Sequence, residues 1–247
     1  MTEAINNLYQ TFDRYPRPEK IECCPCGCTK PDATAHLVVT PLRDLRFLDL
    51  ADYSFRAMTT QGSVDDFRYF LPRLLEGIVE ESYSYFDQTL FQKLSYAKWK
   101  TWPHDEQNAI KGYLKALWLC GLTSFPIVDA LPAFFEIETV LSSIAQTGES
   151  LVPYLEAWDR TTTREADEHL IQFVTMYGQD LAGGKTFSEA FWRDASVQAQ
   201  ELRSWILQAD TLQRIQGAEY LLREDGFEHL FGPALQILAA EAHRLIP

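Results

Sequence analysis

The sequence predicts an all-α fold, and two observations carry that prediction. Hydrophobic residues recur every three to four positions along most of the 247-residue chain, which is the spacing of one helix face. No convincing run alternates with the period of two that a half-buried strand requires. The best strand candidate, residues 170–177, continues a polar stretch that begins like a helix at Thr163. We therefore expect stacked helical hairpins, arranged as an irregular α-solenoid or as a multi-helix bundle.

The composition is that of a folded, soluble protein. Hydrophobic residues make up 46% of the chain and aromatic residues 13%, which is enough to fill a sizeable core. Glycine and proline, at 12 residues each, have ordinary globular frequencies. We expect an N-terminal helix and a Cys-rich loop over residues 1–39, followed by one continuous helical-repeat-like domain over residues 40–247.

The first half of that domain is predicted to contain three amphipathic helices. One is expected over residues 42–56, with an apolar stripe formed by Leu42, Leu45, Leu48, Ala51 and Phe55. A second is expected to begin at Ser63, a favourable N-cap residue followed by acidic residues in the first turn. A third is expected to begin at Pro103, because proline suits the first position of a helix.

The second half of that domain contains further signals for the starts and ends of helices. Gly178 is expected to end a helix, and Ser188 to cap the next one. Gly226 is a stop signal before a last helix that runs through Ala242. A glycine-rich stretch at residues 178–186 is one residue too long for a phosphate-binding loop, so we interpret it as a linker.

A proline motif recurs along the chain. Residues 70–76 (FLPRLLE) reappear at residues 130–136 (ALPAFFE), with looser echoes at residues 152–156 and 232–235. Proline inside a helix removes a backbone hydrogen bond and kinks or restarts the helix. The pattern resembles HEAT/armadillo-type α-solenoids, in which one helix of each pair often carries such a proline, and the likeness could cover residues 40–247. Residues 59–76 also resemble an uncharacterised family of bacterial helical proteins, which implies a fold but no activity.

The net charge of −13 is unevenly distributed. Residues 121–247 contain 19 acidic and 8 basic residues, whereas residues 1–120 are nearly balanced, with 16 and 14. An acidic protein without a basic stripe repels phosphate backbones, so we expect no nucleic-acid partner. The most membrane-like stretch, residues 116–135, is interrupted by two prolines and Asp129, and the N-terminus lacks a signal peptide. We therefore expect a cytoplasmic protein without a membrane partner.

Four of the five cysteines lie within residues 23–28. Cys23 and Cys26 have the C-x-x-C spacing that lets two thiolates meet one Zn²⁺ at about 2.3 Å. Four thiolates this close together cannot all reach one ion without strain, so a complete site needs a distant ligand. The predicted metal ligands are Cys23, Cys26, Cys28 and His36.

Several interpretations of this cluster stay open at the level of the sequence. His104 and Cys120 are other candidate distant ligands. A structural zinc clip and a redox-responsive or soft-metal site compete with a reduced loop that binds no metal. A disulfide is less expected, because the chain has an odd number of cysteines and no secretory signal.

Candidate partner-binding residues come from two features. Lys98 and Lys100 flank Trp99, which we expect to be partly exposed, and Trp102 lies close by; tryptophan is a frequent interface anchor. Residues 121–180 contain 10 acidic and 2 basic residues, which predicts an acidic face for a partner. Glu165 and Asp167 represent that face, although the spacing of Glu165 and His169 also fits an ordinary surface ion pair.

No catalytic signature is found in the sequence. The metalloprotease, nucleophile-elbow and di-iron patterns are absent. We therefore expect a non-enzymatic helical protein-interaction module with no cofactor. An immunity or regulatory role is one specific function that we expect of such a module. The alternative is a small metal-binding protein that uses the cysteines of residues 23–28, and a third possibility is a hydrolase whose site has no familiar sequence pattern.

Overall fold

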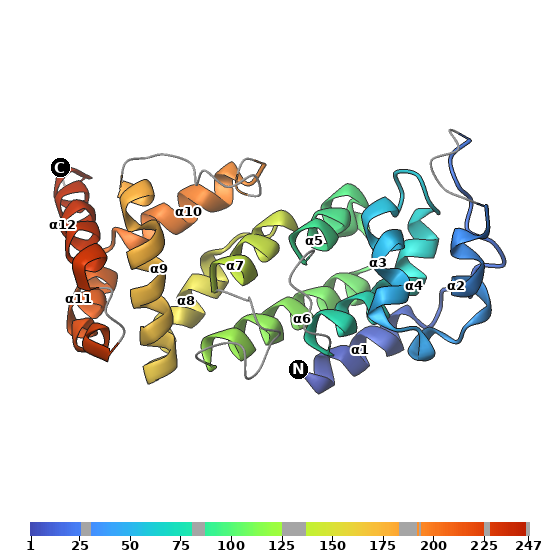
Figure 1. Cartoon of the computed structure of the whole chain (residues 1–247), viewed down its shortest axis with the longest axis horizontal. Helices are drawn as coiled ribbons and strands as arrows, with labels where there is room; N and C mark the ends of the chain where they lie inside the picture. The colour runs from blue at the N-terminus through green and yellow to red at the C-terminus, as the bar shows by residue number, and fades with distance from the viewer. Residues whose placement is uncertain are drawn as a thin grey trace. The chain divides into compact units, whose positions relative to one another are not determined.

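The computed structural model describes residues 1–25, 31–80, 87–124, 137–182, 192, 194–224 and 228–245. These residues form twelve α-helices and four short 3-10 helices, and no β-strand occurs among them (Figure 1). Isolated bridges join Gln61 to Cys23 and to Ala57. The predicted all-α class is confirmed.

The described residues divide into two compact units, one ending at Leu117 and the other beginning at Trp118. The division falls inside a helix rather than after residue 39. Residues 1–39 are included in the first unit because their N-terminal helix packs along a later helix of that unit.

Among the described residues, the first unit contains the N-terminal helix, four further complete α-helices and most of the helix that follows Pro103. Their bounds are α1 (Thr2–Phe12), η1 (Pro31–Thr34), α2 (Ala35–Val39), η2 (Leu42–Asp44), α3 (Phe47–Arg56), α4 (Val64–Glu80), α5 (Asp87–Tyr96), η3 (Trp99–Thr101) and α6 (His104–Leu122). Helix α1 packs along α4, and α3 packs against both α4 and α5.

The helix expected over residues 42–56 is wrong in both its continuity and its buried face. Leu45 and Arg46 have extended backbones between η2 and α3, and the Arg46 amide donates to the Asp49 carboxylate at 2.9 Å to start α3. This interruption changes the rotational phase of the helix. The buried side chains of α3 are Phe47, Leu50, Tyr53 and Ser54, whereas the predicted core residues Leu48 and Phe55 are 50% and 44% exposed.

Helix α4 begins as the sequence predicts. The Ser63 amide donates to Asp66 Oδ2 at 2.6 Å, and the Asp66 amide donates to Ser63 Oγ at 3.2 Å, which is a reciprocal cap. The helix continues through Pro72 to Glu80. The matching motif at residues 130–136 lies outside the described residues, so the repeat interpretation stays a prediction.

The second unit is built from the end of α6 and six further α-helices. These are α7 (Ile137–Gln146), α8 (Val152–Arg160), α9 (Arg164–Ala182), α10 (Ser196–Ile206), α11 (Ala209–Gly217) and α12 (Glu228–Leu245), with η5 (Glu219–Glu224) before α12. Helices α9 and α12 lie side by side (Figure 1). Ser188 and Gly226, expected as a cap and a stop, lie outside the described residues.

Gly178 does not end a helix, as the sequence suggested, but lies inside α9. A Cβ at this position would lie 3.2 Å from the Ala234 Cβ and 3.3 Å from the Leu238 Cδ1, both on α12. The glycine therefore serves the close approach of two helices. Residues 170–177, the best strand candidate, also belong to α9.

A group of tryptophans orients α8 within the second unit. The Trp118 indole donates to the Tyr154 carbonyl at 2.8 Å, and the Trp158 indole donates to the Ala166 carbonyl at 3.0 Å. Trp158 stacks on Trp205 of α10 with ring centroids 5.1 Å apart. Buried indoles with satisfied N–H groups hold their neighbours in defined positions, so α8 and α10 form a fixed pair.

None of the described helices is both long enough and apolar enough to cross a membrane.

Candidate functional site

Only two of the four predicted metal ligands, Cys23 and His36, belong to the residues that the structure describes. Cys23 is a free, half-buried thiol, and the exposed His36 has its Nε2 3.3 Å from the Asp49 carbonyl oxygen. Cys26 and Cys28 lie outside the described residues. Across the residues that are described, no group of three or more His, Cys, Asp or Glu side chains is placed to hold a metal ion.

The remaining cysteines also bear on the metal prediction. Cys24 is disulfide-bonded, contrary to the expectation that a disulfide is disfavoured. A sulfur atom in a disulfide is not available as a thiolate ligand. Cys120 of α6 is a free cysteine, and His104 at the start of α6 is exposed.

The two tryptophans proposed as partner anchors are buried in the first unit. Trp99 is 0% exposed and Trp102 is 4% exposed, so the expectation that Trp99 is partly exposed is wrong. The Trp102 indole donates to the Ala97 carbonyl at 3.1 Å, and its ring packs on Phe12. Flanking lysines did not prevent burial, because the short helix η3 directs the indole of Trp99 inward and leaves Lys98 and Lys100 exposed.

The two acidic residues proposed for a partner face are placed near the start of α9. Asp167 accepts from Arg214 Nε at 2.8 Å, and the same guanidinium donates to the carbonyls of Trp158 and Thr161. Asp167 therefore joins α9 to α11 and is largely occupied by an internal ion pair. The carboxylate of Glu165 accepts hydrogen bonds from the Glu165 backbone amide and from Thr163, and these bonds lower the pKa of Glu165. A carboxylate in this position stabilises the first turn of α9.

His169 is not a surface partner of Glu165. Its ring is 1% exposed, and Nε2–H donates to the carbonyls of Gly121 and Ser124 at 3.0 and 2.7 Å. These carbonyls lie at the C-terminal end of α6, where helical carbonyls lack partners within the helix. Burial lowers the pKa of His169, and the two carbonyls and Glu165 oppose this effect only in part.

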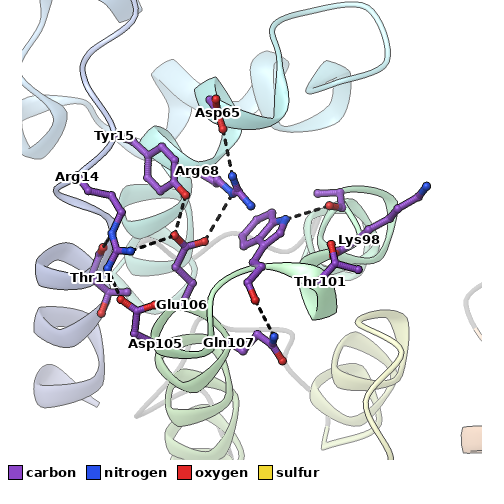
Figure 2. Close-up of polar contacts among 12 residues, drawn as sticks. Thr11, Arg14, Tyr15, Asp65, Arg68, Lys98, Thr101, Asp105, Glu106 and Gln107 are labelled. Carbon is purple, nitrogen blue, oxygen red and sulfur yellow. Dashed lines mark hydrogen bonds and ion pairs between the residues drawn. The ribbon is translucent and has the colours of Figure 1, made fainter.

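A buried carboxylate network in the first unit was not predicted from the sequence (Figure 2). Glu106, in the first turn of α6, has a side chain that is 0% exposed. It accepts a hydrogen bond from the Tyr15 hydroxyl at 2.7 Å, and its carboxylate lies 3.8 Å from Arg14 and 3.6 Å from Arg68. Three segments, the end of α1, the start of α4 and the start of α6, therefore meet on one carboxylate.

The groups around Glu106 make further contacts within the first unit. The guanidinium of Arg68 lies 4.3 Å from the centre of the Trp102 ring and also donates to Asp65 at 3.1 Å. Burial and the hydrogen bond to Glu106 raise the pKa of Tyr15 to about 12, so the phenol keeps its proton at neutral pH. A general acid or base needs a pKa near the working pH, which this phenol does not have. We interpret the network as a set of polar contacts that holds α1, α4 and α6 together.

The second unit contains an open groove between α8 and α10, with a volume of about 700 Å³. Val152 and Leu155 line one wall, and Val197 and Trp205 line the other. Leu155 and Trp205 are buried at 2% and 4% exposure and form the floor, whereas Val152 and Val197 are 45% and 65% exposed. The groove therefore combines a packed apolar floor with uncovered apolar edges.

The polar residues of the groove are acidic or neutral. Three carboxylates line it, Glu156 and Asp159 on α8 and Glu201 on α10, and no basic residue lies among its described lining residues. Glu201 accepts from Ser150 Oγ at 2.9 Å and from the Leu151 amide at 2.6 Å, which caps the start of α8. The Trp205 indole donates to both oxygens of Asp159, at 2.9 and 3.0 Å.

Sequence reasoning placed an acidic partner face in residues 121–180 but missed α10. The signal available in α10 was the four-residue spacing of Val197, Glu201 and Trp205, which puts them on one helix face. That spacing is equally typical of a core stripe. Only the packing of α8 shows that this face is covered at Trp205 and open at Val197.

No protein-family profile, curated protein or solved structure matches this chain.

Proposed function

We propose that this protein is a non-enzymatic helical protein-interaction module whose partner docks in the groove between α8 and α10. One observation carries the proposal: Val152 and Val197 are 45% and 65% exposed on the edges of a groove whose floor is already packed. Exposed apolar side chains gathered around a concave surface mark interaction sites more often than isolated ones do.

The groove suits a protein segment better than a small molecule. A small-molecule site encloses most of its ligand, with roughly 70 to 90% of the ligand surface buried. Here the edges are open and both walls are helices, an arrangement that fits a helix laid into a groove. The walls are also held in place, because Trp205 stacks on Trp158 and Glu201 caps α8.

The chemistry of the groove favours binding over catalysis. Asp159 and Glu201 accept hydrogen bonds from the protein's own indole, hydroxyl and amide groups. Histidine and cysteine, the usual bases and thiol nucleophiles, are absent from its described lining residues. An immunity or regulatory role would follow from the identity of the partner.

A site-specific photo-crosslinker tests the proposal. A benzophenone amino acid at Val197 is expected to capture a discrete protein in cells of the source organism. The matched control places it at Met176, which is 53% exposed on α9 and does not line the groove. Val152→Asn in the Val197-labelled protein is expected to abolish the adduct, because an uncharged polar amide at the groove edge opposes apolar docking. Equal capture from both positions, or capture that survives Val152→Asn, would contradict docking in this groove.

A further inference from the structure

We infer that the segment docking in this groove is a basic amphipathic helix of the partner protein, an inference that rests on the proposed function above. The groove offers an apolar floor for the apolar face of such a helix and carboxylates for its basic side chains. Its apolar floor lies between two walls that each carry carboxylates, and the described lining residues include no cation to neutralise them.

Two carboxylates of the groove accept hydrogen bonds from neutral groups. Asp159 and Glu201 are held by neutral donors, namely an indole, a hydroxyl and a backbone amide. Such bonds fix the position of a carboxylate without cancelling its charge. Glu156 has Arg160 at 3.5 Å, but Arg160 is 69% exposed, and an exposed pair of this kind is weak and readily exchanged for a better partner.

The carboxylates and the apolar residues of the groove are spaced along two helices. Glu156 and Asp159 are three residues apart on α8, and Glu201 lies between Val197 and Trp205 on α10. The lining residues of α10 run from Ser196 to Trp205, and with a rise of about 1.5 Å per residue they span about 14 Å. A helix of about three turns therefore fits the groove, with its apolar face on the floor and its flanks beside the carboxylates.

A partner helix without basic flanks would bind this groove less favourably. A helix with neutral flanks would withdraw the three carboxylates from water without giving them ionic partners. A helix with acidic flanks would add repulsion between like charges. Lysine or arginine on the flanks gives each carboxylate a partner at the groove edge, so basic flanks are the complement that this groove selects.

Synthetic peptides of about three helical turns test the inference directly. Three versions share one Leu-rich apolar face and carry Lys, Gln or Glu on both flanks. Fluorescence anisotropy at about 0.15 M salt measures their binding to the full chain. The Lys version is expected to bind at least about tenfold more tightly than the Gln version, and the Glu version most weakly.

Paired variants separate the groove from the overall acidity. Glu156→Gln with Asp159→Asn is expected to weaken the Lys peptide about tenfold. The control, Glu19→Gln with Glu219→Gln, removes the same charge from two exposed residues that do not line the groove, and it is expected to change affinity less than about twofold. Equal weakening by both pairs would overturn the inference, because it would show attraction to net charge alone.

The remaining outcomes distinguish this inference from the proposed function. Equal binding of the Lys, Gln and Glu peptides, abolished by Val197→Asn, would overturn the basic partner while supporting docking in the groove. Absence of binding by all three peptides would overturn the amphipathic helix, and the crosslink at Val197 would then decide on the docking site separately. Circular dichroism and thermal unfolding of each variant verify that it is folded.

Discussion

Gly77 of α4 lies directly against Phe47, the first residue of α3 and a fully buried one. A Cβ placed on Gly77 would lie 2.8 Å from the Phe47 Cβ and closer still to its ring. Real Cβ atoms do not approach other carbons this closely, so only glycine allows α3 to start where it does. This contact sets the position of α3 on α4.

Gly77→Ala is expected to destabilise the protein by about 2 kcal/mol, because overpacking outweighs the better helix propensity of alanine. Gly112→Ala in α6 is the matched control, since a Cβ there meets nothing within 4 Å. The control is expected to stabilise by about 0.5 to 1 kcal/mol. Urea unfolding measures both. A stabilising Gly77→Ala would show that α3 can move away from α4 at little cost.

The carboxylate of Glu106 is expected to contribute strongly to stability. Glu106→Ala removes the buried carboxylate beside the largely buried guanidinium of Arg68, which then keeps the exposed Asp65 as a partner, and breaking a buried ion pair costs about 3 kcal/mol. The neighbouring Asp105 pairs with Arg14 at the surface, where both side chains are about half exposed, so Asp105→Ala is expected to cost far less. Urea unfolding measures the loss of stability in both variants. Comparable losses would show that the buried carboxylate of Glu106 contributes no more than the exposed one of Asp105.

The stability of the protein is expected to fall on acidification because of His169. Burial lowers the pKa of this imidazole from its ordinary value of 6.5, so the unfolded chain binds a proton more readily than the folded one. Stability is therefore fully present above pH 6.5 and is lost as the pH falls through the lowered pKa of the folded state.

Unfolding free energies measured across this pH range test the assignment to His169. His169→Asn is expected to cost about 1 kcal/mol at neutral pH through lost hydrogen bonds, and to show a flatter decline below pH 6.5. His243→Gln removes an exposed imidazole near the end of α12 and is expected to keep the wild-type slope. An unchanged slope in His169→Asn would assign the acid sensitivity to other groups.

Ser63 is expected to be worth about 1 kcal/mol as the N-cap of α4. Ser63→Ala removes the oxygen that accepts from the Asp66 amide, whereas Ser63→Asn keeps an acceptor in the same place. Thermal unfolding should show a lower midpoint for the alanine variant and a near-normal one for asparagine. Equal midpoints in the two variants would show that the cap contributes little.

The all-α class and several helix starts could be predicted because their signals are local. The cap at Ser63 depends on residues three positions apart, and the apolar spacing of α4 is complete within that helix. The buried face of α3 could not be predicted in the same way. Two extended residues before α3 shift its rotational phase, so Leu45 of the predicted stripe is buried whereas Leu48 and Phe55 are exposed.

The acidic character of the candidate site could be predicted from the sequence, but its residues could not. The acidic excess of residues 121–180 indicated an acidic face, and two carboxylates of the groove, Glu156 and Asp159, come from that stretch. The residues predicted to bind a partner do not line the groove. Asp167 forms an ion pair with Arg214, and Trp102 is buried in the core of the first unit. The pairing of α8 with α10 joins residues about 45 positions apart, which no periodicity reveals.

The helical character, the acidity and the absence of familiar catalytic motifs are properties of the sequence, because each depends on residue types or on spacings within one helix. Which apolar residues remain exposed was decided by the tertiary structure. Trp99 flanked by lysines became buried, whereas Val197 stayed open beside Trp205. The physical reason is that burial depends on which helix packs against a given face, and that choice is made by contacts between residues far apart in the chain, such as the stacking of Trp158 on Trp205.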